Sequence, residues 1–281
     1  MDSFVFAAVL FAAACHAGWN AAIKGGVDTV STTSVIAIGA GVVALAFLPF
    51  VGLPLRPAWP WVSGSILIHL LYFIGLSESY RVGDLGQVYP LARGTAPLMT
   101  AALSGPLIGE ALGARAWVGI VALAAGVLLL SARGGRALAR FDPHATGLAL
   151  FTAMTICAYS LVDGMGARLA GSAHAYTASL FIGNAVVLAG YGLARRGREA
   201  VPALVAYWRI GLAGGALQLL AYGIVIWAMT VAPIAIVAAL RETSVLFGSV
   251  LAVVFLREPL RGIRIGAALM IVAGLVLIRL Y

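Results

Sequence analysis

The chain is an almost unbroken succession of apolar segments, each about as long as a membrane crossing. Glycine, proline and charged residues divide it into ten segments. They run over 3–23, 31–52, 60–80, 85–107, 114–132, 145–167, 173–194, 205–230, 234–256 and 262–280. A helix needs about 20 apolar residues to cross the hydrocarbon layer of a bilayer. The sequence therefore predicts an all-α membrane protein with ten transmembrane helices.

The composition excludes a water-soluble fold and argues against nucleic acid as a partner. Of the 281 residues, 62% are hydrophobic and only 10% are charged, whereas soluble domains carry about 25% charged residues. The formal charge is +8, but the basic residues lie in short loops at segment ends and form no basic element interleaved with aromatics. At those positions they set orientation and meet lipid headgroups. We therefore expect membrane lipids, and no nucleic acid, as partners.

Two parts of the chain repeat. A shift of 148 residues lays 88–112 over 236–260, so that Arg93 meets Arg241 and Glu110 meets Glu258. An arginine inside the membrane and a loop glutamate in the same register are rarer coincidences than matching leucines. The pattern predicts two five-helix repeats, 1–132 and 144–281, joined by a connecting loop over 133–143.

An odd number of crossings in each half makes the second half enter from the opposite side of the membrane. The repeat is therefore predicted to be inverted, around a central cavity. Such repeats place a substrate site near the midplane and permit alternating access when one half rocks against the other.

Loop charge predicts the orientation, because positive loops stay in the cytoplasm. One side carries Lys24, Arg81, Arg133, Arg136, Arg140, Arg195, Arg196, Arg198, Arg257, Arg261 and Arg264, and the other carries Arg56, Arg115, Arg168 and Arg279. The first group is assigned to the cytoplasm, which places both termini outside.

Polar groups at bilayer depth are costly, by about 2.5 to 3.5 kcal/mol on translocon scales, and usually face an interior cavity. Several recur at helical spacing within one segment. The candidates for substrate binding are His16, Trp19, Asn20, His69, Tyr72, Tyr89, Arg93, Tyr159, Asp163, Gln218, Tyr222, Arg241 and Ser244. The two histidines are equally interpretable as interhelical hydrogen-bonding groups, and Asp163 with Arg168 as a helix end.

The two matched arginines carry the sharpest prediction. Pro90 and Pro97 flank Arg93, and proline removes a backbone donor and disturbs the preceding turn, so we expect the fourth helix to be kinked or locally open there. Two arginines from opposite halves would form a positive centre that holds a carboxylate. The alternative for Arg241 is a structural pair with Glu242, although neighbours one residue apart on a helix do not face each other.

Three stretches resemble a known family. "YPLARGTAPLMT" over 89–100 with "GEAL" over 109–112, "ALRETSVLFGSVLAVVFLREPL" over 239–260, and "HAGWNAAIK" over 16–24 look like the drug/metabolite transporter superfamily, EamA-domain type. The resemblance covers both halves and is greatest to YddG-type exporters of amino acids and metabolites. It implies ten helices, a central cavity and efflux across a bacterial inner membrane.

The predicted function is therefore export of small polar metabolites, foremost amino acids including aromatic ones. A proton-coupled exporter of lipophilic cations is the alternative; Glu78 and Glu242 are poorly placed or flanked by arginine for that role. We expect no enzyme, catalytic residue, cofactor or metal, because His16, His69, His144 and His174 are scattered and no catalytic motif occurs. The pattern is compatible with a monomer and leaves the oligomeric state and the coupling ion open.

Overall fold

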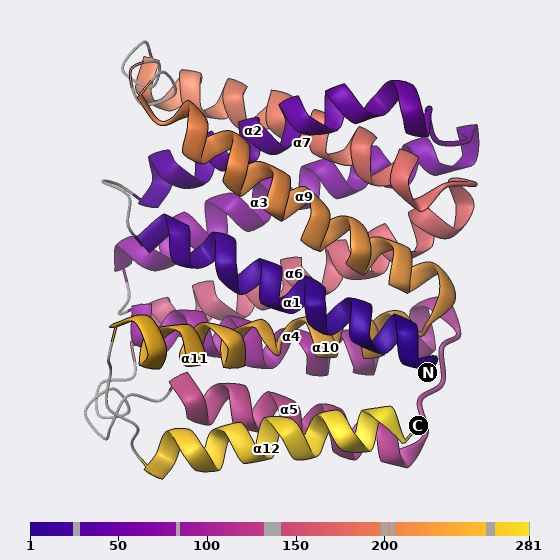
Figure 1. Cartoon of the computed structure of the whole chain (residues 1–281), viewed down its shortest axis with the longest axis vertical. Helices are drawn as coiled ribbons and strands as arrows, with labels where there is room; N and C mark the ends of the chain where they lie inside the picture. Colours follow the sequence, from indigo (N-terminus) through magenta and orange to yellow (C-terminus); the bar gives the residue numbers. More distant parts are fainter. Residues whose placement is uncertain are drawn as a thin grey trace.

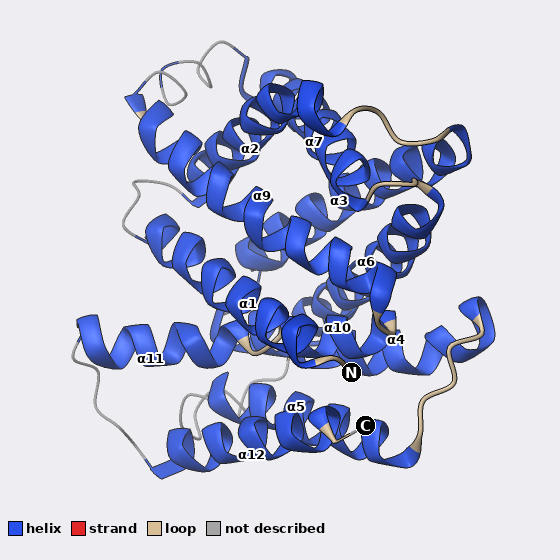
Figure 2. Cartoon of the chain, turned by 45° about the vertical axis from the view of Figure 1, so that its right-hand side comes forward, coloured by secondary structure: helices blue, strands red, loops and turns tan. Residues whose placement is uncertain are grey.

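The computed structural model describes residues 1–24, 29–82, 85–131, 142–197, 202, 206–256 and 262–280. Its regular structure in these ranges is helical, and no strand occurs among them (Figure 2). The elements are α1 (Ser3–Lys24), α2 (Thr29–Val51), η1 (Arg56–Ala58), α3 (Trp59–Val82), α4 (Leu85–Ile108), α5 (Ala114–Ser131), α6 (Pro143–Leu169), α7 (Ala173–Arg196), α9 (Trp208–Val231), α10 (Ile234–Arg241), α11 (Ser244–Leu256) and α12 (Gly262–Arg279).

Nine of the ten predicted segments correspond to one helix each, with ends displaced by three residues or fewer. Eight described segments are long and apolar enough to cross a membrane, and α5 supplies a shorter apolar stretch over Ala114–Leu130. The all-helical, multi-pass class is therefore confirmed.

The ninth segment differs, because it is broken between α10 and α11. Glu242 and Thr243 form a turn, in which the Thr243 N–H bonds to the Leu240 carbonyl oxygen at 3.1 Å and the Leu246 N–H bonds to the Thr243 carbonyl oxygen at 2.9 Å. Hydrogen bonds that reach back three residues belong to tight 3-10 geometry. The ninth segment is thus one apolar stretch long enough to cross a membrane, as predicted, but two helices form it where one was expected.

Helix α4 behaves in the opposite way. It is continuous from Leu85 to Ile108 in spite of Pro97. Neighbouring helices allow a transmembrane helix to keep a proline without opening, and α4 packs against α5, α6 and α10. The predicted local opening beside Arg93 is therefore wrong.

The distribution of side chains is that of a protein surrounded by lipid. Large apolar side chains cover the outside, among them Phe4 and Phe50, whose exposed fractions are 71% and 85%. Charged side chains lie inside, including Arg93 at 4% and Asp163 at 0%. Ionisable groups within membrane helices almost always face the bundle interior, and here they gather where α4, α6 and α10 meet.

Glycines permit the closest helix contacts, at opposite ends of the long axis of the molecule (Figure 1). At one end, a Cβ added to Gly39 of α2 would lie 2.1 Å from the carbonyl oxygen of Gly211 in α9. At the other, a Cβ added to Gly274 of α12 would lie 2.7 Å from the carbonyl oxygen of Gly119 in α5. Small residues allow such backbone approach in membranes.

The two ends of the chain lie side by side (Figure 1). Arg279, in the last turn of α12, donates through Nη1 to the Met1 carbonyl oxygen at 2.8 Å and through Nη2 to Ser3 Oγ at 2.6 Å. The start of α1 and the end of α12 therefore lie on the same side of the bundle, as an even number of crossings requires.

Candidate functional site

Four charged side chains lie buried together in the middle of the bundle. Arg93 comes from α4, Asp163 from α6 and Arg241 from the end of α10, while Glu242 lies in the turn that follows. Their exposed fractions are 4% or less. Because charges cost least inside a membrane protein when they are paired, the pairing of these four decides what the site can bind.

Arg93 pairs with groups from the second half of the chain. Its Nε lies 2.7 Å from Glu242 Oε2, and its Nη2 donates to Ser244 Oγ at 2.8 Å. The predicted site residue Ser244 therefore accepts from Arg93 in this conformation. The pair joins α4 to the break between α10 and α11, more than 140 residues away in sequence.

Arg241 is less completely paired. Its Nη2 lies 3.5 Å from Glu242 Oε1, and its Nε is buried without a hydrogen-bond partner. The guanidinium lies over two aromatic rings, 5.4 Å from the centroid of Tyr159 and 5.9 Å from that of Tyr222. Cation–π contacts hold the group, and one donor direction is unused.

The turn at residue 242 explains how adjacent residues come into contact. Arg241 and Glu242 would point apart on a regular helix, but the helix ends there and Glu242 turns towards both arginines. The alternative interpretation of Arg241 and Glu242 as a structural pair thus describes their mutual contact at 3.5 Å. Glu242, which lies between the two arginines, was not among the predicted site residues.

Asp163 is buried in a different environment. Its Oδ1 accepts from the Tyr176 hydroxyl of α7 at 3.0 Å, and its Oδ2 accepts from the Tyr222 hydroxyl of α9 at 2.5 Å. Among the described residues no lysine or arginine forms an ion pair with it. Tyr176 was not among the predicted site residues, and a tyrosine in an apolar segment gives no signal of its partner.

A stack of aromatic rings connects the two charged regions. His69 of α3 stacks on Tyr159 with ring centroids 4.4 Å apart, and Tyr72 meets Tyr159 edge-on at 5.8 Å. The Nδ1 atom of His69 lies 2.9 Å from the Ser65 carbonyl oxygen. His69 is therefore held by its own helix as well as by the stack.

The remaining predicted residues lie on α1, α4 and α9. Asn20 donates to the His16 carbonyl oxygen at 2.8 Å, and His16 meets Trp19 edge-on at 5.1 Å. The Trp19 Nε1 and Gln218 Oε1 atoms are buried without partners. The side chain of Tyr89 falls outside the described residues.

One end of the bundle is tied by an ion pair. Arg168, near the end of α6, pairs with Glu110 of the α4–α5 loop at 2.5 Å and donates through Nε to the Met229 carbonyl oxygen at 2.9 Å. The second oxygen of Glu110 accepts a hydrogen bond at 2.8 Å from the N–H of Ile234, which lies in the first turn of α10. Arg168 therefore does not pair with Asp163, and the link joins the two halves instead.

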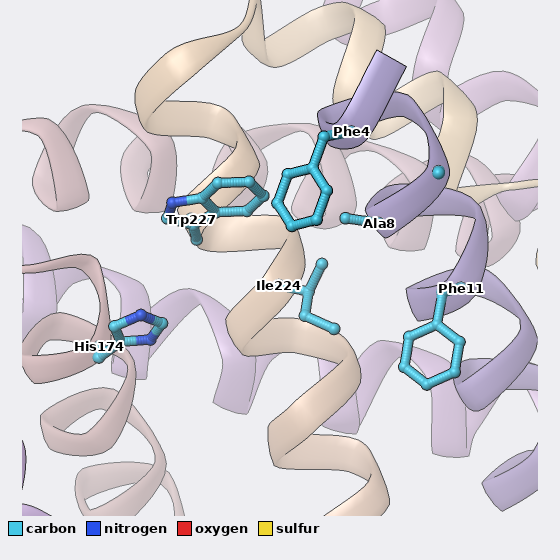
Figure 3. A pocket seen from close by; sticks show the side chains of 7 residues that line it. Phe4, Ala8, Phe11, His174, Ile224 and Trp227 are labelled. Carbon is cyan, nitrogen blue, oxygen red and sulfur yellow. The ribbon is translucent and has the colours of Figure 1, made fainter. Parts of the chain in front are cut away.

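An apolar crevice of about 510 Å³ lies apart from the charged cluster, among α1, α7 and α9 (Figure 3). Its lining residues are Phe4, Ala7, Ala8, Phe11, His174, Ile224 and Trp227. None of them is a predicted site residue. Within the described part of the chain no three His, Cys, Asp or Glu side chains gather in a way that could hold a metal ion.

Comparisons with known proteins support a transporter. Residues 3–132 match the model of the EamA-like transporter family. One solved structure, described only as the crystal structure of a protein, aligns over 99% of this chain and 96% of its own with a TM-score of 0.72 at 18% identity, which shows a shared fold alone. No curated protein matches the chain significantly. The first half therefore carries the sequence pattern of a family of membrane transporters, not of enzymes.

Proposed function

We propose that this protein is a secondary transporter that exports small zwitterionic metabolites, foremost amino acids including aromatic ones, across a bacterial inner membrane by alternating access. The match of 3–132 to the EamA-like transporter family supports transport across a membrane. The substrate class rests on the buried charges.

The observation that carries the substrate class is that two opposite charges, one of an arginine and one of an aspartate, contact the same tyrosine. Arg241 lies over the ring of Tyr222, and the hydroxyl of the same Tyr222 donates to Asp163. A zwitterion needs a cation for its carboxylate and an anion for its ammonium group, since both lose hydration on entry. The aromatic faces of Tyr159 and Tyr222 attract the ammonium group as well.

Arg241, more than Arg93, is the carboxylate ligand in this proposal. Arg93 lies 2.7 Å from Glu242 and donates to Ser244 at 2.8 Å, whereas Arg241 lies 3.5 Å from the same carboxylate. Trp19 Nε1 and Gln218 Oε1, which lack hydrogen-bond partners, are suited to further polar contacts with the substrate. His16, Asn20, His69, Tyr72 and Tyr89 remain predicted contacts or walls.

Alternating access would follow from an inverted repeat of 1–132 and 144–281. The family match ends at residue 132, where the first repeat is predicted to end. The helix contacts are compatible with such a repeat. Helix α3 packs on α6, and its counterpart contact is that of α1 on α9, the eighth crossing. Helix α2 packs on α7, and α5 packs on α12, the tenth crossing. The Glu110–Arg168 pair is then a contact that one half must break to move against the other.

The external position of both termini rests on loop charge, whereas export rests on the resemblance to exporters of the EamA-domain type. Cysteines placed at Arg56 and Arg168 should react with an impermeant maleimide in intact cells, and one at Arg195 should not. The reverse pattern would place the arginine-rich loops outside and overturn the orientation.

The decisive experiment is transport by the purified protein in liposomes. Labelled L-phenylalanine should be taken up by the wild type, and Arg241→Gln should lower the apparent affinity by about tenfold to a hundredfold, since a hydrogen bond to a charged group contributes about 1.5 to 3 kcal/mol. The control is Arg209→Gln, an exposed arginine on α9, which should transport normally. Equal uptake by both variants would contradict the proposal.

A lipophilic cation is the second candidate, and Asp163 is the observation that favours it. A buried carboxylate with aromatic neighbours and no ion-pair partner also suits an organic cation. Labelled tetraphenylphosphonium in the same liposomes distinguishes the two, because a cation exporter would move it and leave L-phenylalanine untransported.

A further inference from the structure

We propose that Glu242 is a specificity-determining residue. By offsetting one of the two buried arginines it keeps the site neutral overall, so that the site accepts zwitterions and rejects anions of the same shape. This inference rests on the proposed function for the place of the substrate, beside Arg241 and Asp163. The role of Glu242 itself rests on the charges and contacts around the break between α10 and α11.

The charges buried in the described part of the chain balance one another. The charged side chains buried there are Arg93, Asp163, Arg241 and Glu242. Both oxygens of Asp163 accept from tyrosine hydroxyls, and the two oxygens of Glu242 face arginines at 2.7 Å and 3.5 Å. Carboxyl groups in such surroundings are ionised, so two carboxylates offset two guanidinium groups. His16 and His69 add no charge in their neutral form.

Glu242 acts on the substrate through the arginines. Its carboxylate lies between Arg93 of α4 and Arg241 of α10, and its exposed fraction is 1%. An ammonium group that approached it would meet two guanidinium groups of like charge, whereas the hydroxyls that contact Asp163 carry none. Asp163 therefore receives the ammonium group, and Glu242 sets the net charge of the site.

Net charge selects the ligand because the site is buried at membrane depth. A charge that is not compensated there is costly, and a charged group that leaves water must be paired to offset its lost hydration. A zwitterion adds no net charge to a neutral cluster, whereas an anion of the same shape leaves one negative charge unbalanced. Specificity of this kind needs an element that opposes the wrong ligand, and Glu242 is that element against anions.

The test uses three ligands that share one ring and differ in charge. They are L-phenylalanine, 3-phenylpropionate, which lacks the ammonium group, and 2-phenylethylamine, which lacks the carboxylate. Their affinities are measured by calorimetry on purified protein in detergent. In Glu242→Gln the cluster carries one positive charge. The ratio of the affinity for L-phenylalanine to that for 3-phenylpropionate should therefore fall by about tenfold to a hundredfold from the wild-type ratio.

The matched control is the double variant Arg93→Gln with Glu242→Gln. It removes one charge of each sign, so the cluster is neutral again and the ratio should return to that of the wild type. Arg93→Gln alone leaves one negative charge and tests the same rule from α4 if Glu242→Gln does not fold. In that variant the affinity for 2-phenylethylamine should rise relative to that for L-phenylalanine. Each variant is extracted with the ligand that its charge favours, because bound ligand stabilises the folded protein.

The outcomes separate this inference from the proposed function. If Glu242→Gln weakens L-phenylalanine and 3-phenylpropionate by the same factor, or if the double variant keeps the altered ratio, Glu242 does not select by charge, although binding of L-phenylalanine to the wild type would still support the proposed substrate. If the wild type does not bind L-phenylalanine, yet 3-phenylpropionate raises the melting temperature of Glu242→Gln more than that of the wild type, the proposed substrate is wrong and the charge rule stands.

Discussion

Helix α4 and the broken pair α10–α11 are matched by the 148-residue shift, yet they differ at the residue after the arginine. Gly94 follows Arg93, whereas Glu242 follows Arg241. Gly94 packs closely on α5, where an added Cβ would lie 2.6 Å from Leu128 Cγ. Glu242 instead ends its helix and faces both arginines. The comparison shows that two matched arginines need not share a role, because the one acid lies 2.7 Å from Arg93 and 3.5 Å from Arg241.

The largest expected effect is on stability, from Arg93→Gln. It leaves Glu242 with only the 3.5 Å contact to Arg241, and removal of one partner from a buried pair costs about 3 to 5 kcal/mol. The melting temperature in detergent should fall sharply, and further than for Arg241→Gln, which leaves the 2.7 Å pair intact.

The double variant Arg93→Gln with Glu242→Gln serves as the control. It removes both charges of the close pair, so its loss should be smaller than the sum of the two single losses. Equal losses for Arg93→Gln and Arg241→Gln would contradict the division of roles between the two arginines.

An intermediate effect is expected from Gly94→Ala. The new methyl group would lie 2.6 Å and 2.8 Å from the Cγ and Cδ2 atoms of Leu128, and such overpacking typically costs about 1 to 3 kcal/mol. The matched control is Gly248→Ala on α11, where nothing lies within 4 Å of the added Cβ. That control should keep or slightly raise the melting temperature; a loss as large as that of Gly94→Ala would mean that the contact with α5 is unimportant.

The smallest expected effect is from Glu110→Gln, in the loop that follows α4. Glu110 and Arg168 are partly exposed, at 14% and 30%, and solvent limits such pairs to about 1 kcal/mol. Stability should change little, but a cysteine at Ala232 should react faster with an impermeant maleimide as the two halves separate more often. An unchanged labelling rate would mean that the pair does not hold this end closed.

Sequence reasoning predicted the crossings well, because the length of an apolar run depends on local composition alone. The ends of α6 and α9 lie within three residues of those predicted. The break at Glu242 was not predicted, since no proline or glycine marks it. The contact made at the break is long-range, because the Glu242 carboxylate pairs with Arg93, far away in the sequence.

The site was predicted as a set of residues but not as a set of contacts. Buried polar groups were recognisable from their cost in a membrane, which singled out Arg93, Asp163 and Arg241. Which carboxylate pairs with which arginine depends on packing between helices and was not accessible. Of the predicted aromatic residues, Tyr159 and Tyr222 lie against Arg241, and their contact with a substrate stays a prediction. Tyr176 was not among the predicted residues.

The bond between Arg279 and the first residues of the chain has a consequence for biogenesis. Met1 and Ser3 leave the ribosome long before the arginine that holds them, which follows more than 270 residues later in the sequence. Helix α5 likewise precedes its close partner α12. Membrane helices insert one by one and pack afterwards, so α1 and α5 must wait in the bilayer with these faces against lipid until α12 has been made.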